Sequence, residues 1–444
     1  MKLRLKRELG LFEAVFYGLG IIIGAGVYVL IGEAAALAGN ALWLSFFAGA
    51  LISTFTGLSY AELSAMYPKA AAEFVYVKKA YGSKLFAFLI GWLIIFTGIV
   101  SAATVSLGFS KNLRGFTCQF FFDCSHYNSA KAFDTITIIA ISAALIAGLS
   151  FVNFAGIKES SRFNIIFTSV EIIGLVIIIF LGLPAVGKVD YFYSPLGTKG
   201  IFSAAALIFF AYIGFEDIVN IAEETKSPKK NIPYALILAI AITMLLYIFT
   251  AIASVSIAGW EELASSDAPL AYAASKTFLG PNAYLLLSVI TLFATSSTVL
   301  IILVVTSRMV YGMARENSFP ALLGRVHRRT KTPWMAVAAI GLLSMAFVLV
   351  GDMSIIANVT SLGALVSFMV INLSLIWLRY TKPKLKRPFK VPFNIGNYPV
   401  LAFCGVFTCW FLIFQFEWHI IAVSIVVVAA GAVFYWLRRN KIIE

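Results

Sequence analysis

Glycines are concentrated in a segment that is otherwise apolar enough to cross a membrane. The stretch GLGIIIGAGVYVLIG, from Gly18 to Gly32, contains five glycines. Each glycine costs about 1 kcal/mol relative to alanine inside a helix, so a segment that only anchors a protein has no reason to accumulate them. A second apolar segment, FFAYIGFEDIVN, is interrupted in the same way at Gly214. We therefore expect both helices to be broken near their middle.

A broken helix inside a membrane offers backbone groups that can bind a ligand. The N–H groups at the start of a half-helix suit a carboxylate, and the freed carbonyls suit an ammonium group or a metal ion. Such backbone must face protein or a water-filled cavity, because lipid cannot satisfy it. Two breaks together fit a ligand with both charges on one carbon, an α-amino acid. The alternative is that Gly20 and Gly24, in G-x-x-x-G spacing, only let two helices pack closely.

One carboxyl group lies in the middle of another apolar segment, SRFNIIFTSVEIIGLVIIIFLG, at Glu171. A charge near the bilayer centre is costly, so such a residue is a candidate for function. Burial favours the protonated form of a glutamate, which makes Glu171 a candidate proton carrier. Alternatively, its carboxylate binds sodium, with the hydroxyls of Ser296 and Ser297 completing the site. A third alternative is a neutral, hydrogen-bonded glutamate that holds helices together.

Long apolar blocks separated by short polar breaks make up most of the 444 residues, of which 61% are hydrophobic and 12% charged. The mean hydropathy is +0.92, and a soluble domain would carry about a quarter charged residues. Twelve blocks are long enough for membrane helices. They lie near residues 11–31, 41–66, 85–110, 134–154, 163–183, 200–221, 233–258, 283–312, 334–351, 355–378, 399–416 and 419–437. We predict an all-α polytopic membrane protein with twelve transmembrane helices.

The lysines and arginines are distributed unevenly between the two sides of the membrane. With both termini in the cytoplasm, 28 of the 34 fall in cytoplasmic segments, as the positive-inside rule requires. The net charge of +13 therefore reflects topology in the cell membrane and implies no nucleic-acid partner. The sequence has no H-E-x-x-H, P-loop or G-x-S-x-G motif, so we expect no enzyme and no cofactor.

The two interrupted segments occupy equivalent places in the chain. Each break lies about thirteen residues into the first of five consecutive spans, and sets with an odd number of spans are inserted in opposite orientations. We therefore expect a cytoplasmic N-terminus (1–10), a first repeat (11–183), a second repeat (200–378), two additional helices (399–437) and a cytoplasmic C-terminus (438–444).

Several segments resemble the amino acid–polyamine–organocation superfamily of secondary transporters. GIIIGAGVY is similar to the family's broken first helix, and FFAYIGFEDIVNIAEETKSPKKNIPYA to its sixth helix and the following loop. SYAELSAMYP and SRMVYGMARENSFP are similar to the cytoplasmic ends of its second and eighth helices. The resemblance implies the leucine-transporter-type fold, with a five-plus-five inverted repeat, and amino-acid transport by alternating access.

The resemblance also implies positions for the substrate. They are Ile21, Gly24, Ala25, Gly26, Phe210, Ala211, Tyr212, Ile213, Phe215 and Glu216. The backbone of the first helix would hold the substrate carboxylate, and carbonyls of both helices would hold its ammonium group. The aromatic side chains would shape or gate the pocket. Because adjacent helical residues point in different directions, we expect Glu216 to face the cavity and Asp217 to have a structural or gating role.

The chain departs from the family in two places. The loop after the second span reads PKAAAEFVYVKKAYG from Pro68, where the family has paired glycines, so we expect the inward gate to differ. Many family members have a lysine at the position of Glu171, and its ammonium is thought to stand where sodium-coupled relatives bind their cation. A carboxylate reverses that charge, and we therefore favour proton coupling over sodium coupling.

The sequence leaves several alternatives open. The substrate is either a small or neutral amino acid, or a cationic amino acid or polyamine taken up in exchange, which Glu216 would favour. A non-transporting amino-acid sensor is a further alternative. Cys118 and Cys124 either form a disulfide or remain free thiols. The basic segment RYTKPKLKRPFKVP contacts anionic lipid headgroups or only sets topology. The oligomeric state is not determined by the sequence.

Overall fold

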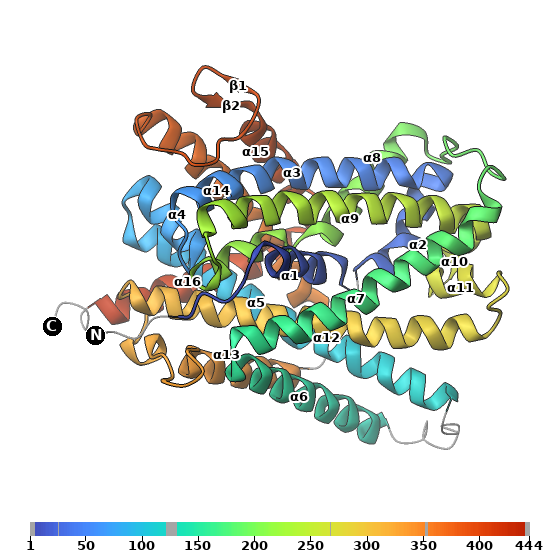
Figure 1. Ribbon diagram of the computed structural model, residues 1–444, viewed down its shortest axis with the longest axis horizontal. Coiled ribbons are helices and arrows are strands. Elements are labelled where there is room, and N and C mark those ends of the chain that lie inside the picture. Colours follow the sequence, from blue (N-terminus) through green and yellow to red (C-terminus); the bar gives the residue numbers. More distant parts are fainter. Residues whose placement is uncertain (1–4, 25, 121–130, 267, 351–353, 440–444) are drawn as a thin grey trace.

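The computed structural model describes residues 5–24, 26–120, 131–266, 268–350 and 354–439, which form a bundle of helices (Figure 1). Within these residues, ten helical segments are long and apolar enough to cross a membrane. Two shorter apolar helices, α13 (Trp334–Val348) and α15 (Val400–Ile413), lie where the ninth and eleventh spans are expected. The prediction of an all-α, multi-pass membrane protein is confirmed.

The long helices follow one another as the apolar blocks predict, and shorter elements that the blocks do not predict lie between them. The remaining α-helices are α1 (Leu11–Ile23), α2 (Gly26–Ala38), α3 (Leu42–Met66), α4 (Ala72–Tyr81), α5 (Lys84–Phe120), α6 (Lys131–Ala155), α7 (Ile157–Gly182), α8 (Gly197–Phe209), α9 (Pro228–Ala258), α10 (Trp260–Ser265), α11 (Pro269–Ser275), α12 (Asn282–Arg315), α14 (Ser354–Thr381) and α16 (Trp418–Arg439). Short 3₁₀ helices are η1 (Gly39–Ala41), η3 (Leu183–Ala185), η4 (Phe210–Tyr212), η5 (Phe215–Glu224) and η6 (Ala321–Gly324). Strands β1 (Asn394–Ile395) and β2 (Tyr398–Pro399) form an antiparallel hairpin.

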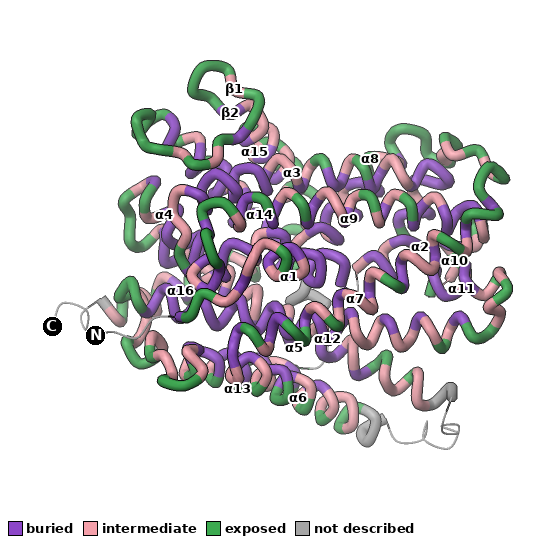
Figure 2. The backbone as a smooth tube through the Cα atoms, viewed as in Figure 1, coloured by how far each residue is buried: buried purple, intermediate pink, exposed green. Residues whose placement is uncertain are grey.

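The bundle has a buried centre and an apolar outer surface. Most residues of α1, α12 and α14 are buried, whereas most of α6 and α16 are not (Figure 2). In the centre, α1 packs against α7, α9 and α12, and α12 packs against α5. Large apolar side chains such as Phe151 of α6 and Leu342 of α13 are exposed, as a surface that faces lipid requires.

Both expected helix breaks are present. α1 ends at Gly24, which has a φ of 32°, and α2 begins at Gly26. α8 continues into η4, and the chain then turns at Gly214, with a φ of 116°, before η5 begins. Only glycine adopts such positive φ values without strain, so these residues let the helices change direction. The breaks also touch each other, because a Cβ on Gly214 would lie 2.8 Å from Cγ1 of Ile21.

Buried ion pairs hold the end of the bundle where α3 leads into α4. Nε and Nη2 of Arg308 on α12 lie 2.9 and 3.0 Å from the carboxylate oxygens of Glu224 on η5. Glu62 of α3 pairs with Arg379 of α14 and with Arg387, whose Nε lies 3.1 Å from Oε1. Buried charges are tolerated when they are paired, so these contacts fix how the helices meet. In Figure 1, α4 lies at one end of the bundle, and α10 and α11 lie at the other.

Candidate functional site

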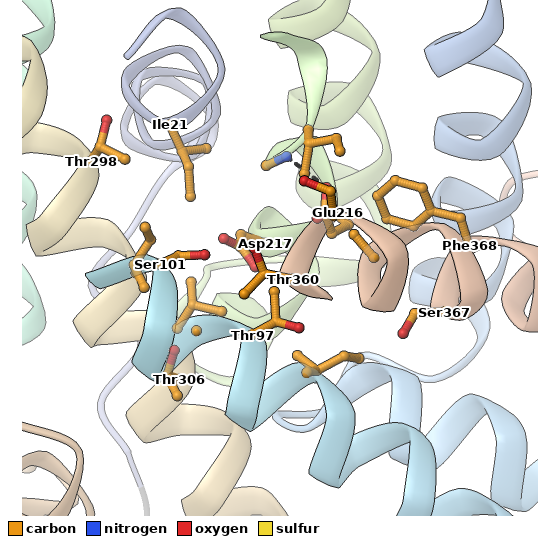
Figure 3. A pocket seen from close by; sticks show the side chains of 18 of the residues that line it. Ile21, Thr97, Ser101, Glu216, Asp217, Thr298, Thr306, Thr360, Ser367 and Phe368 are labelled. Carbon is orange, nitrogen blue, oxygen red and sulfur yellow. Dashed lines mark hydrogen bonds between the residues drawn. The ribbon is translucent and has the colours of Figure 1, made fainter. Parts of the chain in front are cut away.

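A cavity of about 280 Å³ lies beside the two breaks. Ile21 of α1 and the segment around Gly214 form one part of its wall, α5, α12 and α14 form most of the rest, and α3 and α4 contribute one residue each. Three carboxyl groups line it, those of Glu73, Glu216 and Asp217. Its serine and threonine side chains are Thr97, Ser101, Thr298, Thr306, Thr360, Ser361 and Ser367, of which all but Ser361 are labelled in Figure 3, and Tyr60 adds a phenolic hydroxyl. The cavity therefore combines free helix ends with polar side chains, as binding sites for small polar molecules do.

Four of the substrate positions expected from the sequence line this cavity: Ile21, Phe210, Ile213 and Glu216. Gly24 lies next to it, because a Cβ there would be 2.8 Å from Oγ1 of Thr298 in the cavity wall.

The other expected positions surround the cavity without lining it. Gly26 packs on Ala211, with 3.5 Å from an added Cβ to the alanine Cα, so the second break covers the start of α2. The Tyr212 hydroxyl donates a hydrogen bond to the carbonyl of Phe46 at 3.2 Å. Phe215 is fully buried behind the wall. Ala25 lies outside the described residues, as does the pairing of Cys118 with Cys124.

A tyrosine that the sequence analysis did not single out links the two breaks. The hydroxyl oxygen of Tyr247, on α9, lies 2.8 Å from the carbonyl oxygen of Ile22 and 3.3 Å from that of Ile23. It also lies 3.4 Å from the carbonyl oxygen of Ala211 in the second break. One hydroxyl proton can serve one carbonyl at a time, so the other carbonyls stay available to a donor. The signal in the sequence is a tyrosine within an apolar span, since a buried tyrosine needs a hydrogen-bond partner.

Both acidic residues of the second break face the cavity. Glu216 folds back, so that its Oε2 accepts a hydrogen bond of 2.8 Å from the N–H of Gly214. The Asp217 carboxyl lies among hydroxyl side chains such as Ser101 and Thr360 (Figure 3). Asp217 lines the cavity together with Glu216, although only one of these adjacent residues was expected to face it, because the cavity takes in residues on both sides of the turn at the start of η5.

A third carboxyl reaches the cavity from the short helix α4. Glu73 is buried, and its carboxylate oxygens accept hydrogen bonds of 3.1 and 3.4 Å from Nδ2 of Asn220. Burial raises the pKa of Glu73 from 4.5 to about 7, although the Asn220 amide acts in the opposite direction. The sequence analysis noted this loop as unusual but did not single out its carboxylate.

Glu171 lies outside the cavity, in the packed region between α7 and its neighbours. Its side chain is fully buried, and within the described residues neither carboxylate oxygen has a hydrogen-bond partner. The hydroxyls expected to join it make other bonds: Ser296 donates to the Leu292 carbonyl at 2.8 Å, and Ser297 donates to Oδ1 of Asn164 at 3.2 Å.

A cluster of neutral oxygen atoms lies close to Glu171, one helical turn along α7. The Ser297 hydroxyl is 3.4 Å from the carbonyl oxygen of Gly20 and 3.5 Å from the hydroxyl of Thr168. A Cβ on Gly20 would lie 2.7 Å from Oδ1 of Asn164 and 2.8 Å from the Ser297 hydroxyl. Oxygen atoms from α1, α7 and α12 thus meet at one point, and hard cations prefer oxygen ligands.

Comparisons with known proteins identify the family of the chain. A family model described as amino acid permease matches residues 9–437. The chain is 31% identical to the branched-chain amino acid permease BcaP of Bacillus subtilis, over 98% of this chain and 94% of that protein. It is 28% identical to a methylthioribose transporter of the same organism, over the same shares of the two chains. It is 30% identical to the vacuolar cationic amino acid transporter 4 of Arabidopsis thaliana, over 86% of this chain and 64% of that protein. The chain therefore belongs to the amino acid permease family, within the amino acid–polyamine–organocation superfamily.

Proposed function

We propose that the protein is a secondary active transporter that moves L-amino acids across the cell membrane by alternating access, with Glu171 as the proton carrier. The observation that carries amino-acid transport is the meeting of two broken helices at one cavity. Backbone N–H groups at a half-helix start suit the substrate carboxylate, and free carbonyls suit its ammonium. Both groups are common to all L-amino acids.

The proposal assigns the two breaks to equivalent places in two inverted repeats, residues 11–183 and 200–378. The final helices, residues 399–437, lie outside the repeats, and both termini are cytoplasmic. In this arrangement a four-helix bundle moves against a scaffold formed by the other helices, so that the cavity opens to each side of the membrane in turn.

Proton coupling is supported by the surroundings of Glu171. An ionised carboxylate that is buried without a partner is very costly, so the occluded protein favours the neutral acid. Thr168 lies one turn away on α7, and its hydroxyl contacts Ser297, which in turn reaches the carbonyl of Gly20 on α1. A proton gained or lost at Glu171 therefore acts where α7 meets the first broken helix.

The test is uptake by the Glu171→Gln variant in liposomes. We expect an inward proton gradient to stimulate uptake in the wild-type protein and to have no effect on the variant, because glutamine cannot release a proton. Counterflow of substrate between two equal pools should continue, since it needs no net proton movement. The matched control is Glu262→Gln, which removes an exposed carboxylate. Gradient-driven uptake in Glu171→Gln at the wild-type level would contradict the assignment.

Sodium coupling is the second candidate, and the oxygen cluster around Gly20, Asn164, Thr168 and Ser297 favours it. The discriminating measurement is uptake driven by an inward sodium gradient at equal pH on both sides. Under proton coupling this gradient has no effect. Under sodium coupling it drives uptake, and Ser297→Ala raises the sodium concentration that gives half-maximal uptake.

A further inference from the structure

The carboxyl groups that line the cavity differ from two other carboxylates of the bundle in having no positive partner. Glu62 and Glu224 are buried and each pairs with arginine. Glu73, Glu216 and Asp217 make no ion pair with any residue of the described chain, and the cavity lining contains no lysine, arginine or histidine. Buried carboxylates are costly unless a counter-charge or hydrogen-bond donors meet them. A ligand that carries a positive charge and hydrogen-bond donors would fit this part of the cavity.

The three carboxyl groups lie near enough to repel one another when they are charged, so the lack of a positive partner affects all three. The charges of Glu216 and Glu73 both repel the charge of Asp217. Hydrogen bonds satisfy only part of the cluster: Glu216 accepts one from Gly214, and Glu73 accepts from Asn220. The Asp217 carboxyl makes no hydrogen bond within the described part of the chain and lines the open space of the cavity (Figure 3).

A fully buried hydroxyl gives independent support for a ligand at this end. Tyr60 of α3 lines the cavity next to the carboxyl groups, with none of its surface exposed. Its ring packs edge-on against Phe215 and Phe368, with ring centroids 6.1 Å apart in both cases. Within the described residues, its hydroxyl has no hydrogen-bond partner. Buried hydroxyls normally have one. The Tyr60 hydroxyl lies near enough to the Glu73 carboxyl to lower its pKa, and its oxygen can still accept a hydrogen bond from what enters the cavity.

The acidic groups do not compete with the backbone for the amino-acid head group. The head group belongs at Ile21 and at the carbonyls of the breaks, whereas Glu73 comes from α4, the helix that follows the departure from the family's glycine pattern. A substrate held at the breaks would extend its side chain along the wall toward Asp217 and Glu73.

We propose that Glu73, Asp217 and Tyr60 form a subsite for the far end of the substrate side chain, and that it selects amino acids whose side chains end in a cationic, multiply hydrogen-bonding group. This inference rests on the proposed amino-acid transport, because the backbone at the breaks must first hold the head group. Tyr60 accepts a hydrogen bond from the cationic group, and the two carboxylates supply its counter-charge.

The test compares two ligands that differ only at the far end. L-lysine and L-norleucine have the same carbon chain, but norleucine lacks the terminal amine. Binding to the protein in liposomes is measured at pH 8, above the raised pKa of Glu73, which is about 7. We expect the wild-type protein to bind lysine at least about tenfold more tightly, the effect of one charge-assisted hydrogen bond in a buried site.

Two variants assign the preference to these residues. Asp217→Asn and Glu73→Gln keep the shape and remove one charge each, and we expect each to reduce the lysine-to-norleucine affinity ratio by about tenfold. The matched control is Glu223→Gln, on the same 3₁₀ helix as Asp217 but outside this cavity, which should leave the ratio unchanged. Having two variants keeps the test valid if one of them does not fold.

The possible outcomes separate this inference from the proposed function. Equal binding of lysine and norleucine by the wild-type protein would overturn the subsite while supporting amino-acid recognition at the breaks. An unchanged ratio in both variants would overturn the assignment to Asp217 and Glu73. Binding of neither amino acid, nor of any other L-amino acid, would overturn the proposed function itself.

Discussion

At the scale of single residues, the backbone of the two breaks depends on one tyrosine hydroxyl. Tyr247 lies within 3.4 Å of carbonyl oxygens from both breaks. It comes from α9, which is a continuous helix around Tyr247. Its position is therefore well defined, and its hydroxyl can hold two segments that lack regular helical hydrogen bonds in place. Its role is to position the binding groups.

We predict that Tyr247→Phe lowers the affinity for amino-acid substrate by about tenfold, because misplaced binding groups lose much of their effect. The measurement is equilibrium binding of the best L-amino acid ligand. The control is Tyr17→Phe, which removes a hydrogen bond from a buried tyrosine to the Ile301 carbonyl, away from the second break. Equal losses in the two variants would mean that Tyr247 has no special position.

The raised pKa of Glu73 has a consequence for stability. Burial raises this pKa from 4.5 to about 7, so the folded state holds a proton that the unfolded state releases between these values. Stability therefore falls as the pH rises through this window. We predict that Glu73→Gln, which cannot ionise, is more stable relative to the wild-type protein at pH 8 than at pH 5. Thermal unfolding in detergent at the two pH values checks this, and a difference that does not change with pH would contradict it.

The sequence allowed only part of the cavity lining to be predicted. Ile21 and Ile213 could be placed because glycines mark the breaks beside them in the sequence. Tyr247 and Glu73 could not, since their contacts are with segments distant in the sequence and leave no local pattern. The place of Asp217 in the cavity lining was not predicted, because helical direction alone does not tell how far a cavity extends around a turn.

At the scale of elements, close packing of the first broken helix against α7 and α12 depends on the absence of a side chain at Gly20. An added Cβ would lie within 2.8 Å of side-chain oxygens of Asn164 and Ser297. Contacts this short force the neighbouring helices to move.

We predict that Gly20→Ala abolishes or strongly reduces transport and lowers thermal stability, because it separates α1 from the oxygen cluster. The control is Gly108→Ala on α5, where an added Cβ meets nothing within 4 Å. That substitution should be neutral or slightly stabilising, by up to about 1 kcal/mol. Wild-type transport in Gly20→Ala would show that the close approach of α1 is not needed.

The elements themselves were largely predictable, because hydropathy and glycine placement are local signals. The block near residues 11–31 corresponds to two half-helices, α1 and α2, separated as the glycines indicate. The 3₁₀ conformation of η5 was not predicted, since helix type after a break depends on packing. The small helices α4, α10 and α11 were also missed, because they are shorter than the window that detects membrane spans.

At the scale of the whole molecule, buried ion pairs connect helices that are distant in the sequence. The Arg308 and Glu224 side chains are 0% and 1% exposed, whereas those of Lys276 and Glu262 in a surface pair are 41% and 45% exposed. Arg308 also donates hydrogen bonds to Asn153 and Ser307, so that one guanidinium joins α12, η5 and α6.

We predict that Arg308→Met destabilises the protein by about 3–5 kcal/mol, because it leaves a buried carboxylate without a partner. Lys276→Met, which breaks the exposed pair, should cost less than about 1 kcal/mol. Chemical unfolding of both variants in detergent compares the two effects. Similar small losses would show that water reaches Glu224.

Above all, we propose that this membrane protein takes up amino acids in response to a proton gradient. The most direct measurement is uptake of a labelled mixture of L-amino acids by liposomes that contain the purified protein, with sodium absent on both sides. We predict accumulation above the outside concentration when a proton gradient is directed inward, and simple equilibration without it. Uptake that is the same with and without the gradient, or no uptake at all, would contradict the account.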